Sequence, residues 1–584
     1  MPPPRSPSTP PRPAAVVDPR SGYCAATKTF HSLRTPPASP PPDDRPLSFP
    51  AAAFSLLPTQ HLPSHPALID STTGETLPFP TFLSRVHALA AALRGELSVS
   101  PGDVIFILAP AGIHIPVLYY AAMSIGAVVS PANPALTAGE VAKLVSLSNP
   151  SMSFTVQAAV GMLPPGLTTV LLDSPTFLSF LSQQELLPHH HEDEDAAGVM
   201  IHQSDPAAIL YSSGTTGSAK AVVITHRNLI AMASSAAAPG TEAAADVLLL
   251  TVPMFHVYGF VFCLRTVVVA QQTLVLHTAR RFNAMDVLGA VGRFRVTRLA
   301  LAPPALLGIV QAAEADDSVA AAHTAAMTLQ AVTCGGASVA PELTRRFSRK
   351  FPNVCLFQVG FSLTQVYFLM CSLLKHGVFL FINYYFYEAT TGFCRLIEME
   401  ETKRIGSVGR LLWGAEAKIV RPETGDALPP GMPGELWVRG PFVMKGYLGE
   451  KDATEAILDR EGWLRTGDLC CIDEDGFIYV LDRLKELIKY KGYQVAPAEL
   501  ESLLQTHPDI DEAAVVPYIS IVEAIYRCSI ALGLIVIICQ SVVQVVYYKR
   551  IHHVFLVDSI PKNAAGKILR KDLVKMLRHI SSKL

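Results

Sequence analysis

The stretch Tyr211-Ser212-Ser213-Gly214-Thr215-Thr216-Gly217-Ser218-Ala219-Lys220 lies between two apolar runs, Ala207–Leu210 and Val222–Ile224. A loop of Ser, Thr and Gly between two strands presents hydroxyls and bare backbone N–H groups, which suit a polyphosphate. Lys220 adds a cation for the same ligand. A plain turn would need neither the five Ser and Thr hydroxyls nor the lysine. Because the Gly-Lys-Ser/Thr of a Walker A loop is absent, the loop predicts ATP binding by a different architecture.

Upstream and downstream of this loop, residues 51–360 alternate short apolar runs with helix-like segments. Val104–Leu108 predicts a buried strand, Pro116–Ile125 a helix and Ala127–Pro131 the next strand. A strand, a helix and a strand at this spacing indicate a parallel sheet. Thr297–Ala302 predicts another buried strand. These patterns predict an α/β fold for the larger part of the chain.

The pattern changes after Gly431, where short strands, turns and charged residues follow one another. Gly434–Gly440 alternates like a strand, and Asp473–Gly476 is a hairpin signal between apolar runs. The chain has 584 residues, whereas single cores usually stop growing at about 250–300 residues. We therefore expect a change of subdomain here and a small α+β domain at the end.

The charge is nearly balanced, with 47 Lys and Arg against 49 Asp and Glu. This balance gives no reason to expect nucleic acid or an acidic membrane as a partner. The ten cysteines include no CxxC pair, which favours free thiols in a reducing compartment. The three histidines at 189–191 precede four acidic residues and predict a solvated loop rather than a metal site.

The two ends of the sequence carry different signals. Residues 1–50 are rich in Pro, Ser and Ala and contain no secretory signal, so their composition predicts that most of this stretch is disordered. The sequence closes with Ser582-Lys583-Leu584. A terminal Ser-Lys-Leu is an address read by the peroxisomal import receptor, which predicts a peroxisomal location.

Further motifs follow the loop, and together they resemble the adenylate-forming superfamily of acyl-CoA synthetases, luciferases and peptide-synthetase adenylation domains. The resemblance covers about residues 50–360 and most of 388–517 and 548–574. Near the start, Asp18–Tyr23 and Ser32–Arg34 are similar to the lead-in of plant 4-coumarate:CoA ligase-like proteins, including peroxisomal ones. The motifs, in order, are residues 211–220, Pro253–Gly259, Thr333–Ala337, Thr466–Asp468, Asp482–Lys485, Lys489–Val495 and Pro561–Lys567.

The resemblance implies a large α/β N-terminal domain, with two αβ-layered subdomains and a small β-barrel-like subdomain, and a small α+β C-terminal lid domain. It places a Pro-rich, mostly disordered lead-in at residues 1–45, the adenylation domain at 46–484 and the lid at 485–584. The lead-in motif also indicates more order there than composition alone predicts. In this family the lid rotates about the hinge lysine, here Lys485, between two half-reactions.

The implied activity is that of an ATP-dependent carboxylate–CoA ligase, with Mg²⁺ and coenzyme A as further requirements. A carboxylate is a poor electrophile, and attack on the α-phosphate of ATP converts it into an acyl-adenylate. The thiol of coenzyme A then displaces AMP. Tyr258, Phe260 and Phe262 indicate an apolar or aromatic acyl group. A hydroxycinnamate and a fatty acid or oxylipin precursor both remain open as substrates.

The resemblance also assigns roles to individual residues. The catalytic residues would be Lys567, Lys489, Gln494 and His256. ATP and AMP would be bound by Ser212, Ser213, Gly214, Thr215, Thr216, Lys220, Ala337, Gln358, Gly360, Thr364, Asp468, Arg483 and Lys485. The acyl substrate would contact His256 and Tyr258, coenzyme A would contact Arg281, Lys491 and Gly492, and the metal would be held by Thr216 and Glu388.

Two hydrophobic blocks depart from the family pattern, at residues 366–387 and 519–546. The first block separates Thr364 from the metal-binding glutamate, so that position is occupied by Gln365 or displaced to Glu388. The blocks are interpreted as translated introns or other gene-prediction errors. A lineage-specific insertion or a transmembrane helix are the alternatives. With these blocks present, the chain is also open to being a catalytically impaired adenylate-binding protein or a membrane-anchored binding protein.

Overall fold

The computed structural model describes most of the chain, with gaps. The described residues are 16–35, 40–58, 61–182, 200–212, 220–234, 246–279, 281–315, 325, 327–335, 339, 341–360, 382–386, 389–395, 401, 404, 407–484, 488–490, 493–495, 497–504, 513–519, 524–530, 553–555, 557, 559–561 and 568–581.

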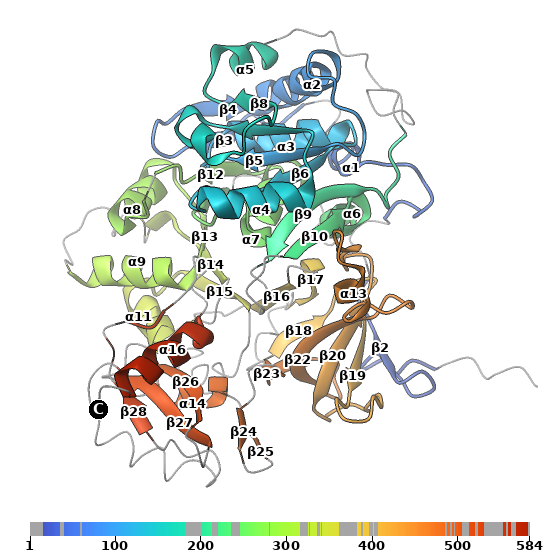
Figure 1. Ribbon diagram of the computed structural model, residues 1–584, viewed down its shortest axis with the longest axis vertical. Coiled ribbons are helices and arrows are strands. Elements are labelled where there is room, and N and C mark those ends of the chain that lie inside the picture. The colour runs from blue at the N-terminus through green and yellow to red at the C-terminus, as the bar shows by residue number, and fades with distance from the viewer. Residues whose placement is uncertain are drawn as a thin grey trace, which may run out of the picture.

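The upper part of the molecule is a sheet in the order β21-β10-β9-β6-β5-β7-β8, covered by helices (Figure 1). The strands from β9 to β8 pair in parallel, as the strand–helix–strand pattern predicted, while β10 runs antiparallel to both β9 and β21. The strands are β5 Val104–Leu108, β6 Val128–Pro131, β7 Met152–Thr155, β8 Thr169–Leu171, β9 Pro206–Ser212, β10 Lys220–Thr225 and β21 Gly446–Tyr447. The helices around it are α2 Phe79–Gly95, α3 His114–Ser124, α4 Ala138–Ser148 and α5 Pro175–Phe180, with a 3₁₀ turn at Gln157–Met162.

The second layered part is built on a parallel run of strands in the order β15-β14-β13-β11-β12-β3, with β4 antiparallel at the edge. The strands are β3 Pro66–Asp70, β4 Thr76–Pro78, β11 Val247–Leu250, β12 Thr273–Leu276, β13 Arg298–Leu301, β14 Ala331–Gly335 and β15 Cys355–Gly360. The helices are α1 Phe49–Phe54, α6 His226–Ser234, α7 Val257–Leu264, α8 Ala284–Arg293, α9 Pro303–Ala315 and α11 Pro341–Lys350, and a π-helical turn, Arg265–Val269, follows α7.

Local chemistry explains several of these elements. Helix α4 begins with a capping box, in which the Thr137 side chain and Glu140 satisfy each other's backbone N–H groups. Helix α3 is apolar on all sides because it is enclosed by protein. Its Tyr119 and Tyr120 are fully buried, and their hydroxyls donate to the carbonyls of Met254 and Leu264, at 3.3 and 2.7 Å. The two phenols therefore enter the core without leaving a polar group unsatisfied.

The parallel sheet continues without a break into a curved antiparallel region, in the order β16-β17-β18-β23-β22-β20-β19-β2-β1. The strands are β16 Ile382–Phe386, β17 Ala389–Arg395, β18 Ser407–Leu411, β19 Glu416–Val420, β20 Gly434–Arg439, β22 Leu464–Ile472 and β23 Ile478–Arg483, and the short helix α13 is Lys451–Glu455. The predicted strand at Gly434–Gly440 and the predicted turn at Asp473–Gly476 are both confirmed, as β20 and as the link between β22 and β23.

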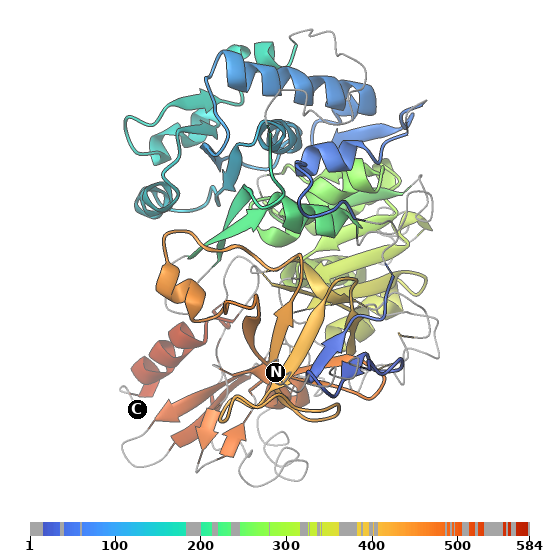
Figure 2. The same ribbon diagram turned by 90° about the vertical axis from the view of Figure 1, so that its right-hand side faces the viewer.

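Composition predicted disorder for the lead-in, whereas its motif indicated more order, and residues 16–35 are ordered, as the motif indicated. This segment, which we call the N-terminal clasp, forms β1 Tyr23–Cys24 and β2 Thr29–His31, and β2 pairs with β19 at the edge of the antiparallel region (Figure 2). Phe30 is fully buried against that region, and its ring packs at a tilt against that of Tyr23, with ring centroids 4.9 Å apart. Composition predicted disorder because the burial of one phenylalanine by a distant strand leaves no local signal.

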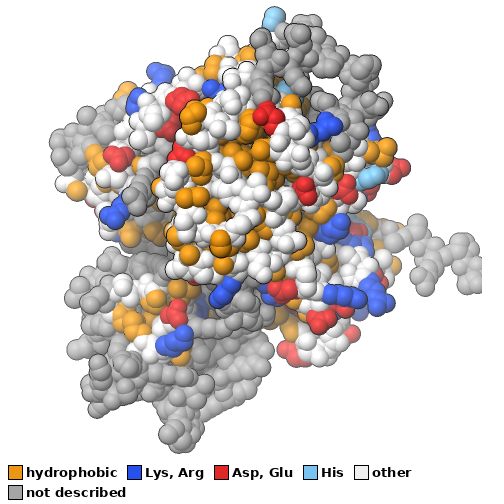
Figure 3. Space-filling model, turned by 45° about the horizontal axis from the view of Figure 1, so that its top comes forward, with side chains coloured by type: hydrophobic (Ala, Val, Ile, Leu, Met, Phe, Trp, Pro, Cys, Tyr) orange, Lys and Arg blue, Asp and Glu red, His pale blue; other side chains and the backbone are white. Residues whose placement is uncertain are grey.

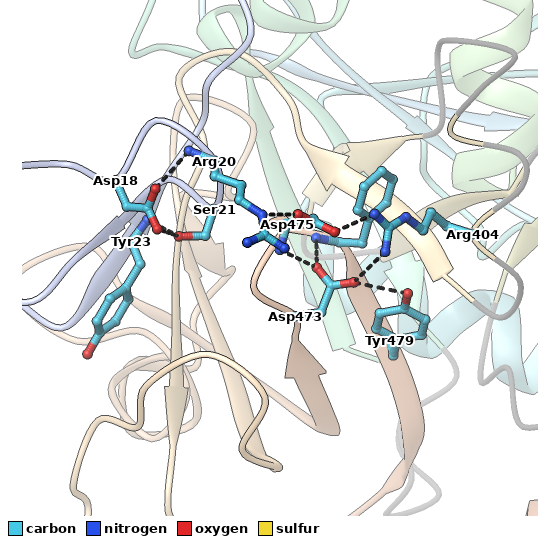
Figure 4. Close-up of polar contacts among 9 residues, drawn as sticks. Asp18, Arg20, Ser21, Tyr23, Arg404, Asp473, Asp475 and Tyr479 are labelled. Carbon is cyan, nitrogen blue, oxygen red and sulfur yellow. Dashed lines mark hydrogen bonds and ion pairs between the residues drawn. The ribbon is translucent and has the colours of Figure 1, made fainter.

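The clasp also contacts the turn between β22 and β23 through an ion pair and the backbone (Figure 4). Asp475 lies between two guanidinium groups, those of Arg20 and Arg404, which hold the pKa of its carboxyl below the usual value. The Asp473 carboxylate accepts a hydrogen bond from the hydroxyl of Tyr479 at 3.1 Å. A Cβ on Gly476 would lie 2.7 Å from the carbonyl oxygen of Ser21, so the two backbones are in direct contact. Farther along, Arg34 donates to both carboxylate oxygens of Glu401 at 2.8 Å.

The C-terminal elements lie in the lower left of Figure 1 and form a small α+β unit. A partly buried ion pair joins Arg570 of α16 to Glu501 of α14, and Glu501 also accepts a hydrogen bond from the N–H of Val515 at 2.7 Å. The elements are β24 Ile488–Tyr490, β25 Tyr493–Val495, α14 Pro497–Leu504, β26 Ala513–Ile519, β27 Ala524–Ile530, β28 His553–Phe555 and α16 Arg570–Ser581.

Each of the two blocks that depart from the family pattern contributes one strand to a sheet. Strand β16 pairs in parallel with β15 and antiparallel with β17. Strand β27 pairs antiparallel with β26 and parallel with β28. The remainder of the first block, and residues 520–523 and 531–546 of the second, lie outside the described residues. Among the helices that the structure describes, none has the length and apolar character to cross a membrane.

Charged side chains of both signs are scattered over the face shown in Figure 3, without a gathering of one sign among the described residues. This distribution agrees with the net charge of −2.

His226, at the start of α6, makes stability depend on pH. Its ring is fully buried, its Nδ1 accepts the N–H of Phe49 at 3.0 Å, and burial lowers its pKa to about 4. The unfolded chain, with a histidine pKa near 6.5, binds more protons between these two values. The free energy of unfolding therefore falls as pH drops from about 6.5 to 4, by about 3 kcal/mol for this group.

We expect His226→Asn, which keeps an acceptor for Phe49 but does not titrate, to remove about 3 kcal/mol of this pH dependence. Urea unfolding at several pH values measures it. The exposed His202→Asn is the matched control and should leave the pH dependence unchanged. Equal slopes for His226→Asn and the parent protein would show that His226 is not the group responsible.

Candidate functional site

The two ends of the Ser/Thr/Gly loop are adjacent in the upper sheet. Ser212 ends β9, Lys220 begins β10, and the two residues are paired across these antiparallel strands. The intervening residues 213–219 are therefore the connection of a β-hairpin, as the sequence predicted for a loop between strands. The Lys220 ammonium lies 4.4 Å from the centroid of the Tyr447 ring on β21.

His256 and Tyr258 lie at the start of α7. The Nδ1 atom of His256 caps this helix by accepting the N–H of Tyr258 at 3.3 Å. Because Nδ1 is used as an acceptor and burial lowers the pKa of His256 to about 4, the ring is neutral at physiological pH. A neutral ring here positions the helix rather than supplying positive charge.

The hydroxyl of Tyr258 donates to the carbonyl oxygen of Thr333 at 2.9 Å, which joins α7 to β14. The ring of Tyr258 also meets that of Phe262 edge-on, with centroids 5.1 Å apart. Strand β14 ends at Gly335, and in the adjacent β15 the backbone of Gln358 pairs with Cys334. This hydrogen bond thus links Tyr258, predicted to contact the acyl substrate, to the Thr333–Ala337 motif, which contains the predicted nucleotide-binding residue Ala337.

The Thr466-Gly467-Asp468 motif lies on β22, in the curved region. Asp468 is only 1% exposed, and its backbone pairs with that of Arg483 on β23. The Thr466 hydroxyl donates to Leu436 O on β20 at 2.7 Å, and the Asp468 N–H donates to Thr466 Oγ1 at 3.1 Å. Two residues predicted to bind the nucleotide are therefore adjacent across one hairpin.

The remaining predicted residues that the structure describes fall in two places. Lys489 and Gln494 are backbone partners in the two-stranded sheet of β24 and β25. Arg281 is exposed, just before α8. Figure 1 shows the β9–β10 hairpin, α7, β14 and β15 near the centre, with β22–β23 and the C-terminal unit below them.

Several predicted site residues lie outside the described residues, so their predicted roles are not tested. They are Ser213, Gly214, Thr215, Thr216, Ala337, Thr364, Glu388, Lys485, Lys491, Gly492 and Lys567. Gly360 is described as the last residue of β15. In the part of the chain that is described, no group of three or more His, Cys, Asp or Glu side chains is arranged to hold a metal ion.

Two groups that contact predicted site residues were not predicted from the sequence. One is the ring of Tyr447 beside Lys220, and the other is the Thr333 carbonyl that accepts from Tyr258. Tyr447 follows Gly446 in the short strand β21, and the surrounding sequence carries no motif that indicates a partner in β10. The pairing of β10 with β21 brings the two together, and it joins residues far apart in the sequence.

Comparison with known proteins gives a consistent result. The profile of the AMP-binding enzyme family matches residues 58–448, more than half of the chain. "4-coumarate--CoA ligase-like 6" of Oryza sativa subsp. japonica is 40% identical, with 97% of this chain and 93% of that protein covered. "Peroxisomal OPC-8:0-CoA ligase 1" of Arabidopsis thaliana is 38% identical, with 96% of this chain and 98% of that protein covered.

Solved structures share the fold at lower identity. ATP-bound MatB from Rhodopseudomonas palustris superposes with a TM-score of 0.74 at 22% identity, covering 91% of this chain and 100% of that one. MenE, the o-succinylbenzoate CoA synthetase from Bacillus subtilis, in complex with its acyl-adenylate intermediate, gives a TM-score of 0.69 at 25% identity, covering 90% and 98%.

Proposed function

Because the chain belongs to the AMP-binding family of adenylate-forming enzymes, as a 4-coumarate:CoA ligase-like acid–thiol ligase, we propose that its acid substrate is a hydroxycinnamate or a similar aromatic acid. The observation that carries this proposal is the aromatic pair Tyr258 and Phe262 on α7. Since the Tyr258 hydroxyl is already engaged by Thr333, the face that it offers is apolar and aromatic.

The first half-reaction makes the acid reactive. A carboxylate oxygen attacks the α-phosphorus of ATP, the bond to the β-phosphate oxygen breaks, and pyrophosphate leaves. Negative charge gathers on the phosphates in this step, and positive groups fixed nearby stabilise it. We assign Lys567 to the carboxylate and α-phosphate, and Lys220 with residues 212–216 to the polyphosphate.

The second half-reaction transfers the acyl group. The thiol of coenzyme A loses its proton to solvent and attacks the carbonyl carbon of the mixed anhydride, and AMP leaves with the electron pair of the broken C–O bond. The mixed anhydride is already activated, so no protein nucleophile is needed. We assign Lys489 and Gln494 to this step, and Arg281, Lys491 and Gly492 to the coenzyme A arm.

The rest of the nucleotide site is proposed from the hairpin geometry and the family motifs. Asp468 would hold the ribose hydroxyls, with Arg483 beside it. The buried position of the Asp468 carboxyl suits a fixed hydrogen-bond acceptor. The adenine and phosphates would further meet Ala337, Gln358, Gly360 and Thr364.

We assign the magnesium ion to Thr216 and Glu388. A hydroxyl and a carboxylate are oxygen ligands of the kind that Mg²⁺ prefers. The ion usually takes its other ligands from substrate phosphates and water. When bound, the ion would neutralise charge on the phosphates. Gln365, which follows Thr364 in sequence, offers only a neutral amide for the same role.

We propose a domain boundary at Lys485, with residues 46–484 as the adenylation domain and 485–584 as the lid. The two half-reactions need different groups at one site, and a hinge between β23 and β24 lets the lid exchange Lys567 for the Lys489–Gln494 hairpin. Residues 366–387 and 519–546 remain assigned as blocks foreign to the family pattern.

A panel of acids tests the substrate assignment. Each acid is incubated with ATP, Mg²⁺ and coenzyme A, and acyl-CoA and AMP are measured. Hydroxycinnamates should give the highest kcat/KM. A higher value for medium-chain fatty acids or cyclic oxylipin acids would instead support the second candidate, which the 38% identity to an OPC-8:0-CoA ligase favours. ATP binding without pyrophosphate release for any acid would indicate an impaired adenylate-binding protein.

We propose a peroxisomal location through Ser582-Lys583-Leu584, and the peroxisomal relative supports it. A fluorescent protein fused to the N-terminus, so that the last residues stay free, should enter peroxisomes. Removal of the last three residues should leave the fusion in the cytosol. Peroxisomal import of the shortened chain would show that another signal directs it.

A further inference from the structure

The contact between Lys220 and Tyr447 has no role in the mechanism above. We propose that the Tyr447 ring is a holding site for the Lys220 ammonium in the nucleotide-free enzyme, from which ATP must release it. This inference rests on the proposed phosphate-binding role of Lys220. The observation that carries it is the 4.4 Å distance between Nζ and the ring centroid, within the range of a cation–π interaction.

The sheet register explains why these side chains meet. Tyr447 is paired with Val222, two residues beyond Lys220 on β10. Residues two apart on a strand share a face, and a diagonal neighbour across two strands lies within reach of a long side chain. Since the loop 213–219 leaves β10 at Lys220, Tyr447 lies opposite a point farther into the strand. The side chain of Lys220 therefore leans along β10, away from the loop end.

Other contacts fix the position of Tyr447, so its ring does not depend on Lys220 to hold it there. The N–H of Tyr447 donates to Thr454 Oγ1 at 2.9 Å, and that hydroxyl donates to Glu450 O at 2.8 Å. A Cβ on Gly446, whose φ is +148°, would lie 2.8 Å from Thr454 Cγ2, so glycine lets β21 approach α13. Tyr447 also packs against the main hydrophobic core.

A holding site of this kind weakens the binding of any ligand that needs the free lysine. If only a fraction of the enzyme has Lys220 available, the apparent Kd is raised by the inverse of that fraction. A partly exposed cation–π contact corresponds to a factor of about two to five. Because phosphates attract an ammonium group more strongly than a neutral ring does, ATP still displaces the contact. Pyrophosphate affinity should be lowered by the same factor, which favours product release.

The test is a double-mutant cycle read out by ATP and pyrophosphate binding in titration calorimetry. Tyr447→Leu should bind both ligands about two- to fivefold more tightly than the parent protein. Tyr447→Phe keeps the ring and is the matched control, with unchanged affinities. In the Lys220→Met background, Tyr447→Leu should have no further effect. A purely structural role for Tyr447 predicts the opposite sign, that is, weaker binding.

The outcomes separate the two proposals. If Lys220→Met leaves ATP affinity unchanged, the phosphate-binding role of Lys220 is wrong. If Lys220→Met weakens ATP binding but Tyr447→Leu does not tighten it, the phosphate role stands and the holding site is overturned. The same tightening in both backgrounds would also overturn the holding site. Thermal unfolding of each variant shows whether it is folded.

Discussion

Replacement of Lys567 by Ala is expected to slow acyl-adenylate formation by about 10²- to 10³-fold, the usual effect of removing one group aimed at developing charge. The reacting carboxylate and α-phosphate are both anionic, so their approach requires a cation between them. The proposed assignment gives this task to Lys567 in the first half-reaction only. The second half-reaction should therefore be almost unaffected, provided the acyl-adenylate is supplied ready-made.

Two assays separate these steps. Acid-dependent exchange of labelled pyrophosphate into ATP reports the first, and release of AMP from a synthetic acyl-adenylate with coenzyme A reports the second. Lys562→Ala, in the same segment, is the matched control and should lose less than about twofold in either assay. Lys489→Ala should show the converse pattern. Equal losses by Lys567→Ala in both assays would refute a role confined to adenylation.

Replacement of Gly22 by Ala should cost about 3 kcal/mol of unfolding free energy. Gly22 has a φ of +74°, and a Cβ there would lie 2.1 Å from the carbonyl oxygen of His31. The backbone conformation alone costs an alanine about 1 kcal/mol, and the overlap adds more because β2 cannot retreat from β19. Release of the N-terminal clasp from the sheet sets an upper limit to the loss, chiefly through exposure of Phe30.

Gly102→Ala isolates the steric part of this effect. Gly102 also has a positive φ, +85°, but no heavy atom lies within 4 Å of its built Cβ. It should therefore cost only about 1 kcal/mol. Urea unfolding of both variants gives the comparison, and limited proteolysis should cut the Gly22 variant first within residues 16–35. Equal losses of unfolding free energy in the two variants would show that the close contact with the His31 carbonyl adds no cost.

Local patterns predicted the elements that depend on near neighbours. Val104–Leu108 is a strand because five consecutive apolar residues are enclosed on both faces, and the turn at Asp473–Gly476 follows from its acidic and glycine residues. The Thr466-Gly467-Asp468 motif is likewise a short run, which lies on β22 with a positive φ at Gly467 and a buried Asp468. Motif order identified the family for the same reason, since each motif is a short run.

Features that depend on distant contacts escaped prediction. Family likeness at Asp18–Tyr23 and Ser32–Arg34 indicated order in the N-terminal clasp, but not the contacts that produce it. These are the pairing of Phe30 with Ala417 and the ion pair of Arg20 with Asp475, and both join residues far apart in the sequence. The Lys220–Tyr447 contact arises from the pairing of β10 with β21. The two foreign blocks were predicted from a break in family likeness, which gave no indication that each supplies a strand.

The position of the N-terminal clasp in the sequence also affects how the protein folds during its synthesis. Residues 16–35 leave the ribosome early, yet their partners on β19 and on the β22–β23 turn are made only after residue 416. At a synthesis rate of about 5–20 residues per second, the clasp waits roughly 20 to 80 s for them. During that time Phe30 is without its site, and the nascent chain carries it as exposed apolar surface. A segment that is translated before its partners is thus among the last to be placed.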